Sequence, residues 1–572
     1  MTNARRISSA ALLISAITPT AGFLLAPTAP LSSHSSSSSV FVPSTTYSPG
    51  PPPSSASPSS SCSSSPLSLS LSSSAASSAE LPTLGFPTEK CVAAPSTTGP
   101  ILEPQGEHHP WYSMKPLSEA GEFAKTQGLY FKKCKEANGG APIYKMHPGL
   151  ACIAITDHAS TKWFMSQPET VLDRQDGPYF GPLKCSKDYI GDSLPPLITN
   201  MKESHAEVRA YMVEVMMERV AGTQKALTHA SDNYYEHLKA NGLGEHPMVY
   251  DTFLRQSYAI ILEWALGTGE EGGQPLPPFQ DFVNVNPIDV SLLIGLETDS
   301  PVANAAIEIL TRLKGGGPTK EQKDSVKVLL DSITSSKVWP RFKEVLEKNK
   351  VPITDPERSF MFNTGFQSSA PMAKSMECAI AALNANPDFL KDLQDELDGQ
   401  DLTMAAVGDV EKFPLLDSFH WEILRMFPAP PFYCKKAKMD LVVPTSNGDR
   451  YQIRKGDMLL CHQALGQMDE LKFGSDARQF NPRRFVGNQD LKKDILAYGY
   501  PDSTDVAPKD GMPWGCVAHA IGILDSLLKV FYGRWVQEYT WEMAEPTVID
   551  QDLFLAKAGP TGMAFSKITP RK

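Results

Sequence analysis

The chain has 572 residues, of which 41% are hydrophobic and 20% charged, and its formal net charge at pH 7 is −11. These values lie near globular averages, so the chain can bury a large core. A nucleic-acid-binding surface needs clustered positive charge, and the acidic balance argues against a nucleic-acid partner.

The cysteines exclude several metal and redox motifs. Nine cysteines are spread over the chain, and no two of them are separated by only two residues. This spacing argues against zinc ribbons, thioredoxin-like pairs and covalent c-type haem attachment. An odd number of scattered cysteines favours reduced thiols and an intracellular protein.

Residues 1–79 are nearly uncharged. They contain no acidic residue, and Arg5 and Arg6 carry their only full positive charges. An apolar run follows at residues 7–26, and Ser and Pro dominate residues 32–78. The start has the pattern of a signal sequence, and the Ser/Pro-rich stretch buries too little apolar surface to offset its ordering entropy. We therefore predict a presequence followed by a disordered segment.

Two destinations are compatible with this presequence. A membrane anchor in the endoplasmic reticulum needs about 20 unbroken apolar residues, but residues 18–20 (TPT) interrupt the run. A Ser-rich, acid-free stretch is typical of transit sequences. Residues 19–23 (PTAGF) also resemble the Ala-Phe junction of plastid presequences in algae with complex plastids. We predict import into the plastid (chloroplast), with the endoplasmic reticulum membrane as the alternative.

Residues 80–572 contain no further low-complexity linker and no repeat, so they are predicted to form one large domain. Apolar residues recur at helical spacing in six segments, namely 204–238, 251–266, 301–314, 321–335, 373–383 and 415–426. Strand-like stretches occur at residues 153–156, 440–444 and 451–454. The predicted fold class is mainly α with small β-sheets.

A Glu-x-x-Arg motif lies in the last third of the chain. Glu422 and Arg425 fall on a helix that must end before Pro428. Residues three apart on a helix share a face and can form an ion pair. This motif is common, and a solvated surface pair remains the alternative.

Two further motifs follow it. Residues 480–485 (FNPRRF) place Arg484 between aromatic residues, and residues 513–522 (PWGCVAHAIG) place Cys516 before an apolar helical stretch. A thiolate at a helix N-terminus gains from the helix dipole and from backbone N–H donors. Cys516 with His519 could also be half of a zinc site, but no second pair at ligand spacing completes it.

The order of these motifs resembles that of the cytochrome P450 superfamily. The resemblance implies the cytochrome P450 fold and a haem b whose iron is bound by the Cys516 thiolate. It also implies that Glu422, Arg425 and Arg484 form a structural network behind the haem.

The same resemblance implies partners for the haem propionates. His205 and Arg209 lie four apart on a predicted helix, at the place where P450 enzymes hold these groups. Lys436 matches another such position. A solvated surface charge is the alternative at each of the three positions.

The central helix does not fit ordinary dioxygen activation. Members that activate dioxygen carry an acid followed by Thr in this helix, whereas here Gln367 replaces the acid and serines follow it. Pro371 should also kink the helix. A conventional monooxygenase that needs a reductase is therefore an alternative and not the leading prediction.

The chain resembles more closely the fatty-acid hydroperoxide enzymes of the superfamily: allene oxide synthases, hydroperoxide lyases, divinyl ether synthases and epoxyalcohol synthases. Residues 362–364 (FNT) match their Phe-Asn-Ser/Thr run, and residues 433–487 match more extensively. The chain departs from the group at residues 366–367 (FQ), where the group has Gly-Gly, and at residues 513–515 (PWG), where it has Asn-Lys-Gln.

The resemblance assigns two catalytic positions. Asn363 would hold the hydroperoxide, and Leu183 would stand where allene oxide synthases place a Phe facing the radical intermediate. An aliphatic residue there is the pattern of lyases and epoxyalcohol formers. A helix Asn satisfied by a carbonyl and a plain core Leu are the alternatives.

The implied reaction splits the O–O bond of a polyunsaturated fatty-acid hydroperoxide without dioxygen or reductase. Closure of the resulting radical to an epoxide and return of the hydroxyl give an epoxyalcohol, the favoured product. Hydroperoxide lyase and allene oxide synthase activities follow as alternatives, and a haem-binding carrier without turnover is a further class. Peripheral membrane association is compatible with such a substrate.

Overall fold

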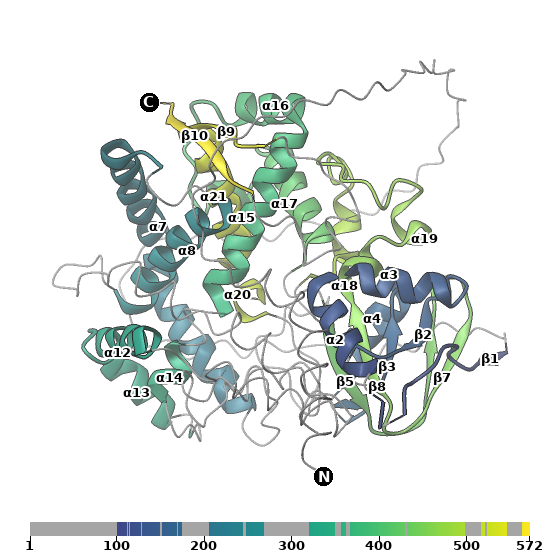
Figure 1. Ribbon diagram of the computed structural model, residues 1–572. Helices are drawn as coiled ribbons and strands as arrows, with labels where there is room; N and C mark the ends of the chain where they lie inside the picture. The colour runs from purple at the N-terminus through teal and green to yellow at the C-terminus, as the bar shows by residue number, and fades with distance from the viewer. Residues whose placement is uncertain are drawn as a thin grey trace, which may run out of the picture. The chain divides into compact units, whose positions relative to one another are not determined.

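The computed structural model describes residues 100–110, 112–113, 115–126, 128–148, 151–168, 170–173, 205–243, 248–267, 320–348, 350, 356–361, 367–428, 432–497, 516–520, 523–545 and 563–571. Helices predominate in this part, together with three small sheets (Figure 1). The predicted presequence and the predicted helix at residues 301–314 lie outside the described residues.

The α-helices of the described part are α2 (Lys115–Thr126), α3 (Gly128–Ala137), α4 (His158–Ser166), α7 (His205–Asn241), α8 (Val249–Leu266), α12 (Lys320–Thr334), α13 (Trp339–Lys348), α14 (Pro356–Met361), α15 (Gln367–Ala385), α16 (Pro387–Leu397), α17 (Pro414–Met426), α18 (Gln463–Gln467), α19 (Glu470–Phe473), α20 (Val517–Ala520) and α21 (Ile523–Glu538). Two 3₁₀ turns accompany them, η3 (Ala406–Gly408) and η4 (Gln489–Asp494).

Ten short strands form three sheets in the described part. They are β1 (Ile101–Leu102), β2 (Ile143–Met146), β3 (Cys152–Ile155), β4 (Leu172–Asp173), β5 (Phe432–Ala437), β6 (Leu441–Pro444), β7 (Arg450–Ile453), β8 (Met458–His462), β9 (Tyr539–Met543) and β10 (Phe565–Pro570). The strand orders are β2-β3-β8-β5-β4, β1-β7-β6 and β10-β9. Within the first sheet β3 and β8 run parallel, and the other pairs are antiparallel.

The predicted fold class is confirmed. Five of the predicted helices appear as α7, α8, α12, α15 and α17, and the predicted strands appear as β3, β6 and β7. Pro371 lies in the second turn of α15, where its missing N–H removes only a hydrogen bond near the start of the helix. Helix α17 ends at Met426, before Pro428, as expected.

The main core lies among the long helices. Helix α8 is buried around most of its circumference, because it packs against both α7 and α15 (Figure 1). A helix that is apolar all round is the pattern of a buried central helix. Helix α8 ends at Gly267, whose left-handed backbone (φ 65°) lets its N–H donate back to the Glu263 carbonyl.

The sheet region is tied to the helices by close packing of α18 against α4. Gly466 of α18 has no room for a side chain, because an added Cβ would lie 2.5 Å from Thr161 Oγ1 and 3.1 Å from the Asp157 carbonyl oxygen. Since α18 directly follows β8, this contact fixes the end of the sheet against α4. Within the described residues, no helix combines the length and apolar character needed to cross a bilayer.

Candidate functional site

Glu422 and Arg425 form a buried ion pair on α17. Both side chains are 0% exposed. Arg425 Nε donates to Glu422 Oε2 at 2.7 Å, and Arg425 Nη2 donates to Oε1 at 2.8 Å. Two parallel bonds of this kind fix the carboxylate and the guanidinium in one plane. The pair is therefore buried rather than solvated.

The remaining N–H groups of Arg425 hold the chain that follows β8. Nη1 donates to the carbonyl oxygens of Gln467 at 2.7 Å and of Ala477 at 2.6 Å, and Nη2 donates to that of Gln479 at 3.1 Å. A guanidinium has five N–H donors in a rigid fork. Here that fork joins α17 to three points of a segment with little regular structure.

Arg484 reaches the same carboxylate from the motif at residues 480–485. Its Nε lies 3.2 Å from Glu422 Oε2 and 3.3 Å from Oε1, and the backbone N–H of Asn481 donates to Oε1 at 2.8 Å. The structure thus brings together Glu422, Arg425 and Arg484, the three residues that the sequence grouped.

Arg484 has a second acidic partner. Its Nη1 donates to Asp476 Oδ1 at 2.9 Å, and this bond holds the pKa of the Asp476 carboxyl below its usual range. Burial alone would lower the pKa of Arg484, but the attraction of Glu422 and the bond to Asp476 outweigh it and raise that pKa. Arg484 therefore stays charged in this network.

Cys516 stands directly before α20 and carries a thiol that is not in a disulfide. The residue is half-buried. Helix α20 contacts both α21 and α7, the long helix that begins with His205 (Figure 1).

The other described cysteines suit packing better than metal binding. Burial raises the pKa of the Cys378 and Cys461 thiols to about 12 and that of the Cys134 thiol to about 11. Burial also raises the pKa of Cys434 well above its ordinary value. A metal ligand must be a thiolate, and apolar burial opposes its formation. Cys134, Cys378, Cys434 and Cys461 are therefore poor candidates for a haem-thiolate ligand.

A carboxylate joins the segment after Cys516 to α17. Asp525, in the first turn of α21, accepts a bond from His519 Nδ1 at 2.9 Å and one from His420 Nε2 at 2.9 Å. His420 is 0% exposed, Asp525 19% and His519 26%. From the sequence, His519 was weighed only as half of a zinc site, and neither Asp525 nor His420 had a predicted role.

The other predicted site residues are placed only in part. Lys436 lies in β5, half-buried, opposite Met458 of β8 and Asp173 of β4. His205 and Arg209 lie in the first turns of α7. Asn363 and Leu183 lie outside the described residues.

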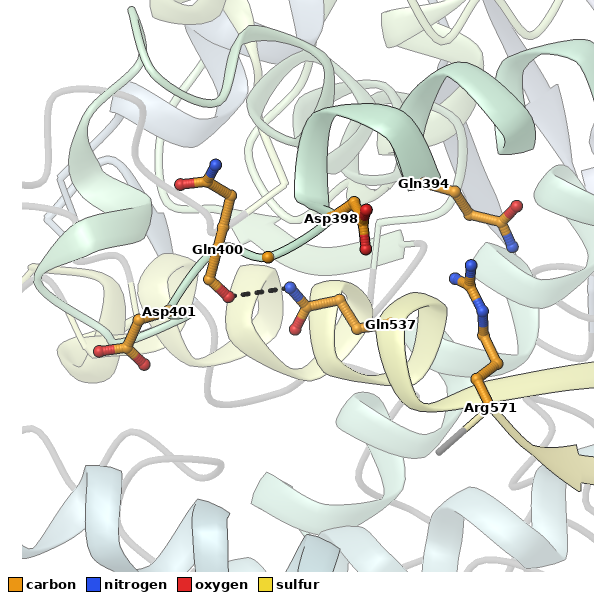
Figure 2. Close-up of a pocket in the computed structure, with 7 residues that line it drawn as sticks. Gln394, Asp398, Gln400, Asp401, Gln537 and Arg571 are labelled. Atoms are coloured by element: carbon orange, nitrogen blue, oxygen red, sulfur yellow. Dashed lines mark hydrogen bonds between the residues drawn. The ribbon is translucent and has the colours of Figure 1, made fainter.

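A polar cavity of about 250 Å³ lies elsewhere, at the ends of α16 and α21. Figure 2 shows Gln537 donating to the Gln400 carbonyl oxygen, a bond of 3.0 Å, with Asp398, Asp401 and Arg571 around it. A lining of amides and charges does not suit a fatty-acid chain, which needs apolar walls. The cavity contains none of the predicted site residues.

Comparison with known proteins identifies the family. The cytochrome P450 family model matches residues 355–500. An epoxyalcohol synthase of Ectocarpus siliculosus is 57% identical over 472 residues, which cover 82% of this chain and 99% of that protein. The chain belongs to the cytochrome P450 family, and with it comes a haem-thiolate cofactor.

Two other relatives are similar over most of the chain. A mitochondrial hydroperoxide bicyclase of Ectocarpus siliculosus is 54% identical over 472 residues, 82% of this chain and 91% of that protein. A mitochondrial hydroperoxide bicyclase of Plasmodiophora brassicae is 30% identical over 447 residues, 77% of this chain and 78% of that protein. The resemblance to the hydroperoxide-metabolising group is thereby confirmed.

The plastid prediction is wrong, because both bicyclases are named as mitochondrial proteins. Mitochondrial and plastid presequences share the composition on which the prediction rested, which is rich in Ser and poor in acidic residues. That composition separates imported from non-imported proteins but does not distinguish the two organelles.

Proposed function

We propose that this protein is a haem-thiolate epoxyalcohol synthase that isomerises polyunsaturated fatty-acid hydroperoxides. The observation that carries the proposal is the 57% identity to an epoxyalcohol synthase, of which this chain covers 99%. An epoxyalcohol contains the same atoms as the hydroperoxide from which it forms. The reaction therefore needs neither dioxygen nor electrons from a reductase.

Cys516 is the proposed iron ligand. When bound, the haem supplies homolytic cleavage of the hydroperoxide O–O bond. Glu422 holds Arg425 and Arg484 in place, and these two arginines fix the segment at residues 467–484 by its carbonyl oxygens. This network is rigid and fully paired, which is the kind of support that a precisely placed cofactor needs.

His205, Arg209 and Lys436 are the proposed partners of the haem propionates. Helix α20, next to Cys516, contacts the helix that begins with His205 and Arg209. Positive side chains on α7 and β5 would pair with the two propionate carboxylates of the haem.

Asn363 is the proposed residue that holds the hydroperoxide, and Leu183 the proposed residue beside the radical carbon. An amide can donate to the distal oxygen and accept from its hydrogen, which orients the O–O bond. An aliphatic side chain at the second position has no aromatic face that could stabilise an electron-poor carbon. Its absence favours the epoxyalcohol over the allene oxide.

Hydroperoxide bicyclase is the second candidate activity, and the 54% identity to such an enzyme favours it over lyase or allene oxide synthase. Both candidates act on a hydroperoxide, and they differ in the product. The protein should therefore be incubated without reductant and without dioxygen with the 9- and 13-hydroperoxides of linoleic acid.

We expect epoxyalcohols that retain both atoms of an ¹⁸O-labelled hydroperoxide group. Bicyclic products would favour the second candidate. Turnover that requires dioxygen and a reductase would contradict the whole proposal.

We further propose a mitochondrial location, supported by the two relatives named as mitochondrial. Peripheral membrane contact is proposed because the substrate is a lipid that partitions into bilayers. A fluorescent fusion and carbonate extraction of isolated mitochondria test both statements, and a fusion confined to another compartment would contradict the first.

A further inference from the structure

We propose that His519, Asp525 and His420 form a positioning bridge, which fixes the segment that carries Cys516 against α17. This inference rests on the proposed function in one respect, namely that Cys516 binds the iron. His519 lies three residues after Cys516, and its Nδ1 donates to Asp525 at 2.9 Å. The other oxygen of Asp525 accepts from His420 Nε2 at 2.9 Å.

The bridge joins three separate elements. His519 belongs to α20, Asp525 to the first turn of α21 and His420 to the middle of α17. Helix α21 also packs directly against both α17 and α20. A shift of the chain after Cys516 relative to α17 therefore requires that at least one of these bonds break.

The charge state of the bridge follows from its donors. Burial would raise the pKa of the Asp525 carboxyl, but the bonds from His420 and His519 outweigh burial and lower that pKa. Asp525 is therefore an anion that accepts from both rings. Its position in the first turn of α21 also suits a negative charge, because the helix dipole is positive there.

His420 is the rigid end of the bridge. Its ring is buried and packs against the rings of Trp421 and Tyr532. Burial lowers the pKa of His420, and its Nδ1 has no hydrogen-bond partner among the described residues. A proton on Nδ1 would be a buried donor without an acceptor, so the neutral ring with Nε2–H is the stable form.

The groups around the bridge are charged and paired. Asp417, three residues before His420 on α17, accepts bonds from Lys492 and from Lys529, the latter at 2.7 Å. Lys529 lies one turn after Asp525 on α21, so α17 and α21 are joined by two adjacent polar links. The bridge continues through His519 to the segment that carries Cys516.

The bridge uses a different face of α17 from the Glu422 network. His420 precedes Glu422 by two residues, which on a helix is a rotation of about 200°. Glu422 faces the segment at residues 467–484, whereas His420 faces α21. Helix α17 is thus held from two sides, and the His420 side leads to the segment that carries the proposed thiolate. His519 and Asp525 are accordingly positioning residues for Cys516.

The test compares variants of the haem-containing protein by the ferrous–CO spectrum, which reports whether the iron ligand is a thiolate or a neutral thiol. Asp525→Asn cannot accept well from both rings, and His519→Ala removes one donor. We expect the thiolate-type band to fall at least threefold relative to the thiol-type band in both variants. Asp388→Asn, which removes an exposed carboxylate from the first turn of α16, is the matched control and should change nothing.

A rescue variant separates positioning from general stability. His519→Asn keeps an N–H donor close to the place of Nδ1, so it should restore most of the thiolate-type band that His519→Ala loses. If His519→Asn and His519→Ala have the same ratio of thiolate-type to thiol-type band, the positioning role of the bridge is wrong. The same follows if this ratio in His519→Ala and Asp525→Asn equals that of the wild type.

Should Asp525→Asn not fold, the two His519 variants decide alone, since His519 is partly exposed and its loss leaves no closed cavity. A wild-type protein without any thiolate-type band would overturn the assignment of Cys516 and, with it, the role of the bridge.

Discussion

Arg425 and Glu422 face each other through two hydrogen bonds of 2.7 and 2.8 Å in a place without solvent. The attraction between the two charges offsets the cost of burying each of them away from water. Removing Glu422 leaves the Arg425 guanidinium without a carboxylate, whereas removing Arg425 leaves Glu422 with Arg484 as its remaining guanidinium partner.

Glu422→Ala and Arg425→Ala should each lower the free energy of unfolding by about 3–5 kcal/mol, because each removes one half of a buried ion pair. Glu422→Ala leaves Arg425 without a carboxylate and leaves Arg484 with Asp476 alone, and Arg425→Ala also leaves the Gln467 and Ala477 carbonyl oxygens without their donor. Urea unfolding and haem content per chain measure the loss. Lys493→Ala, at an exposed ion pair with Asp490, is the control and should leave both values unchanged. Soluble, haem-replete Glu422→Ala protein of wild-type stability would contradict this account.

Cys516→Ser should abolish the thiolate-type band of the ferrous–CO spectrum, since a hydroxyl does not ionise as a thiol does. Cys134→Ser is the matched control, because Cys134 is also half-buried and not in a disulfide. Its spectrum should equal that of the wild type. A thiolate-type band that persists in Cys516→Ser and disappears in another cysteine variant would reassign the ligand.

Gly466→Ala should destabilise the protein by about 1–3 kcal/mol, the usual range for overpacking in a closed contact. The new methyl group would meet Thr161 Oγ1 at 2.5 Å and the backbone oxygen of Asp157 at 3.1 Å. Gly408→Ala provides the control, since nothing lies within 4 Å of its added Cβ. Thermal unfolding of both variants should separate them clearly, and equal transition temperatures would show that α18 can move away from α4.

The stability of the protein should fall as the pH drops below 6.5, in part because of His462. Burial lowers the pKa of this ring from 6.5 to about 3. Between these values the unfolded chain binds a proton that the folded chain does not, so folding loses about 1.4 kcal/mol per pH unit for this group. His462 Nδ1 accepts from the Leu465 N–H at the start of α18, a role that an Asn side chain can also fill.

His462→Asn should therefore reduce the slope of unfolding free energy against pH by about 1.4 kcal/mol per pH unit between pH 5.5 and 4. This change corresponds to the loss of one proton taken up on unfolding. Urea unfolding at a series of pH values measures that slope. His237→Asn, at an exposed position of α7, is the control. An unchanged slope in His462→Asn would mean that this ring takes up its proton in the folded state.

Leu183→Phe should divert part of the product toward an allene oxide, detected as its α-ketol hydrolysis product. An aromatic face can stabilise an electron-poor carbon that an aliphatic side chain cannot. A difference of about 1.4 kcal/mol between two branches changes their ratio tenfold. Asn363→Ala should instead slow all products together, because O–O cleavage precedes the branching. A product ratio that Leu183→Phe leaves unchanged would contradict the position assigned to this residue.

The sequence predicted those parts of the fold whose determinants lie close together in the chain, such as helix-ending prolines and residues at helical spacing. Helix α17 begins with Pro414 and ends before Pro428, and the pairing of Glu422 with Arg425 follows from their spacing on that helix. Arg484 was assigned to this network by the resemblance of residues 480–485 to a P450 motif, and the structure places it against Glu422.

The bridge of His420, Asp525 and His519 has no such signal. Its ends lie about a hundred residues apart, and only the packing of α21 against α17 brings them together. The pairing of β5 with β8 was missed for the same reason, since strand partners distant in the chain leave no periodic pattern.

The parallel pairing of β3 with β8 has a consequence for how the chain is made. Ile153 lies opposite Leu459, so β3 leaves the ribosome about 15–60 s before its partner at a synthesis rate of about 5–20 residues per second. During that interval β2 and β3 form at most a hairpin with an open edge, and such edges pair with other chains. The edge of β3 that pairs with β8 in the folded protein is therefore covered only after Met458–His462 has been synthesised.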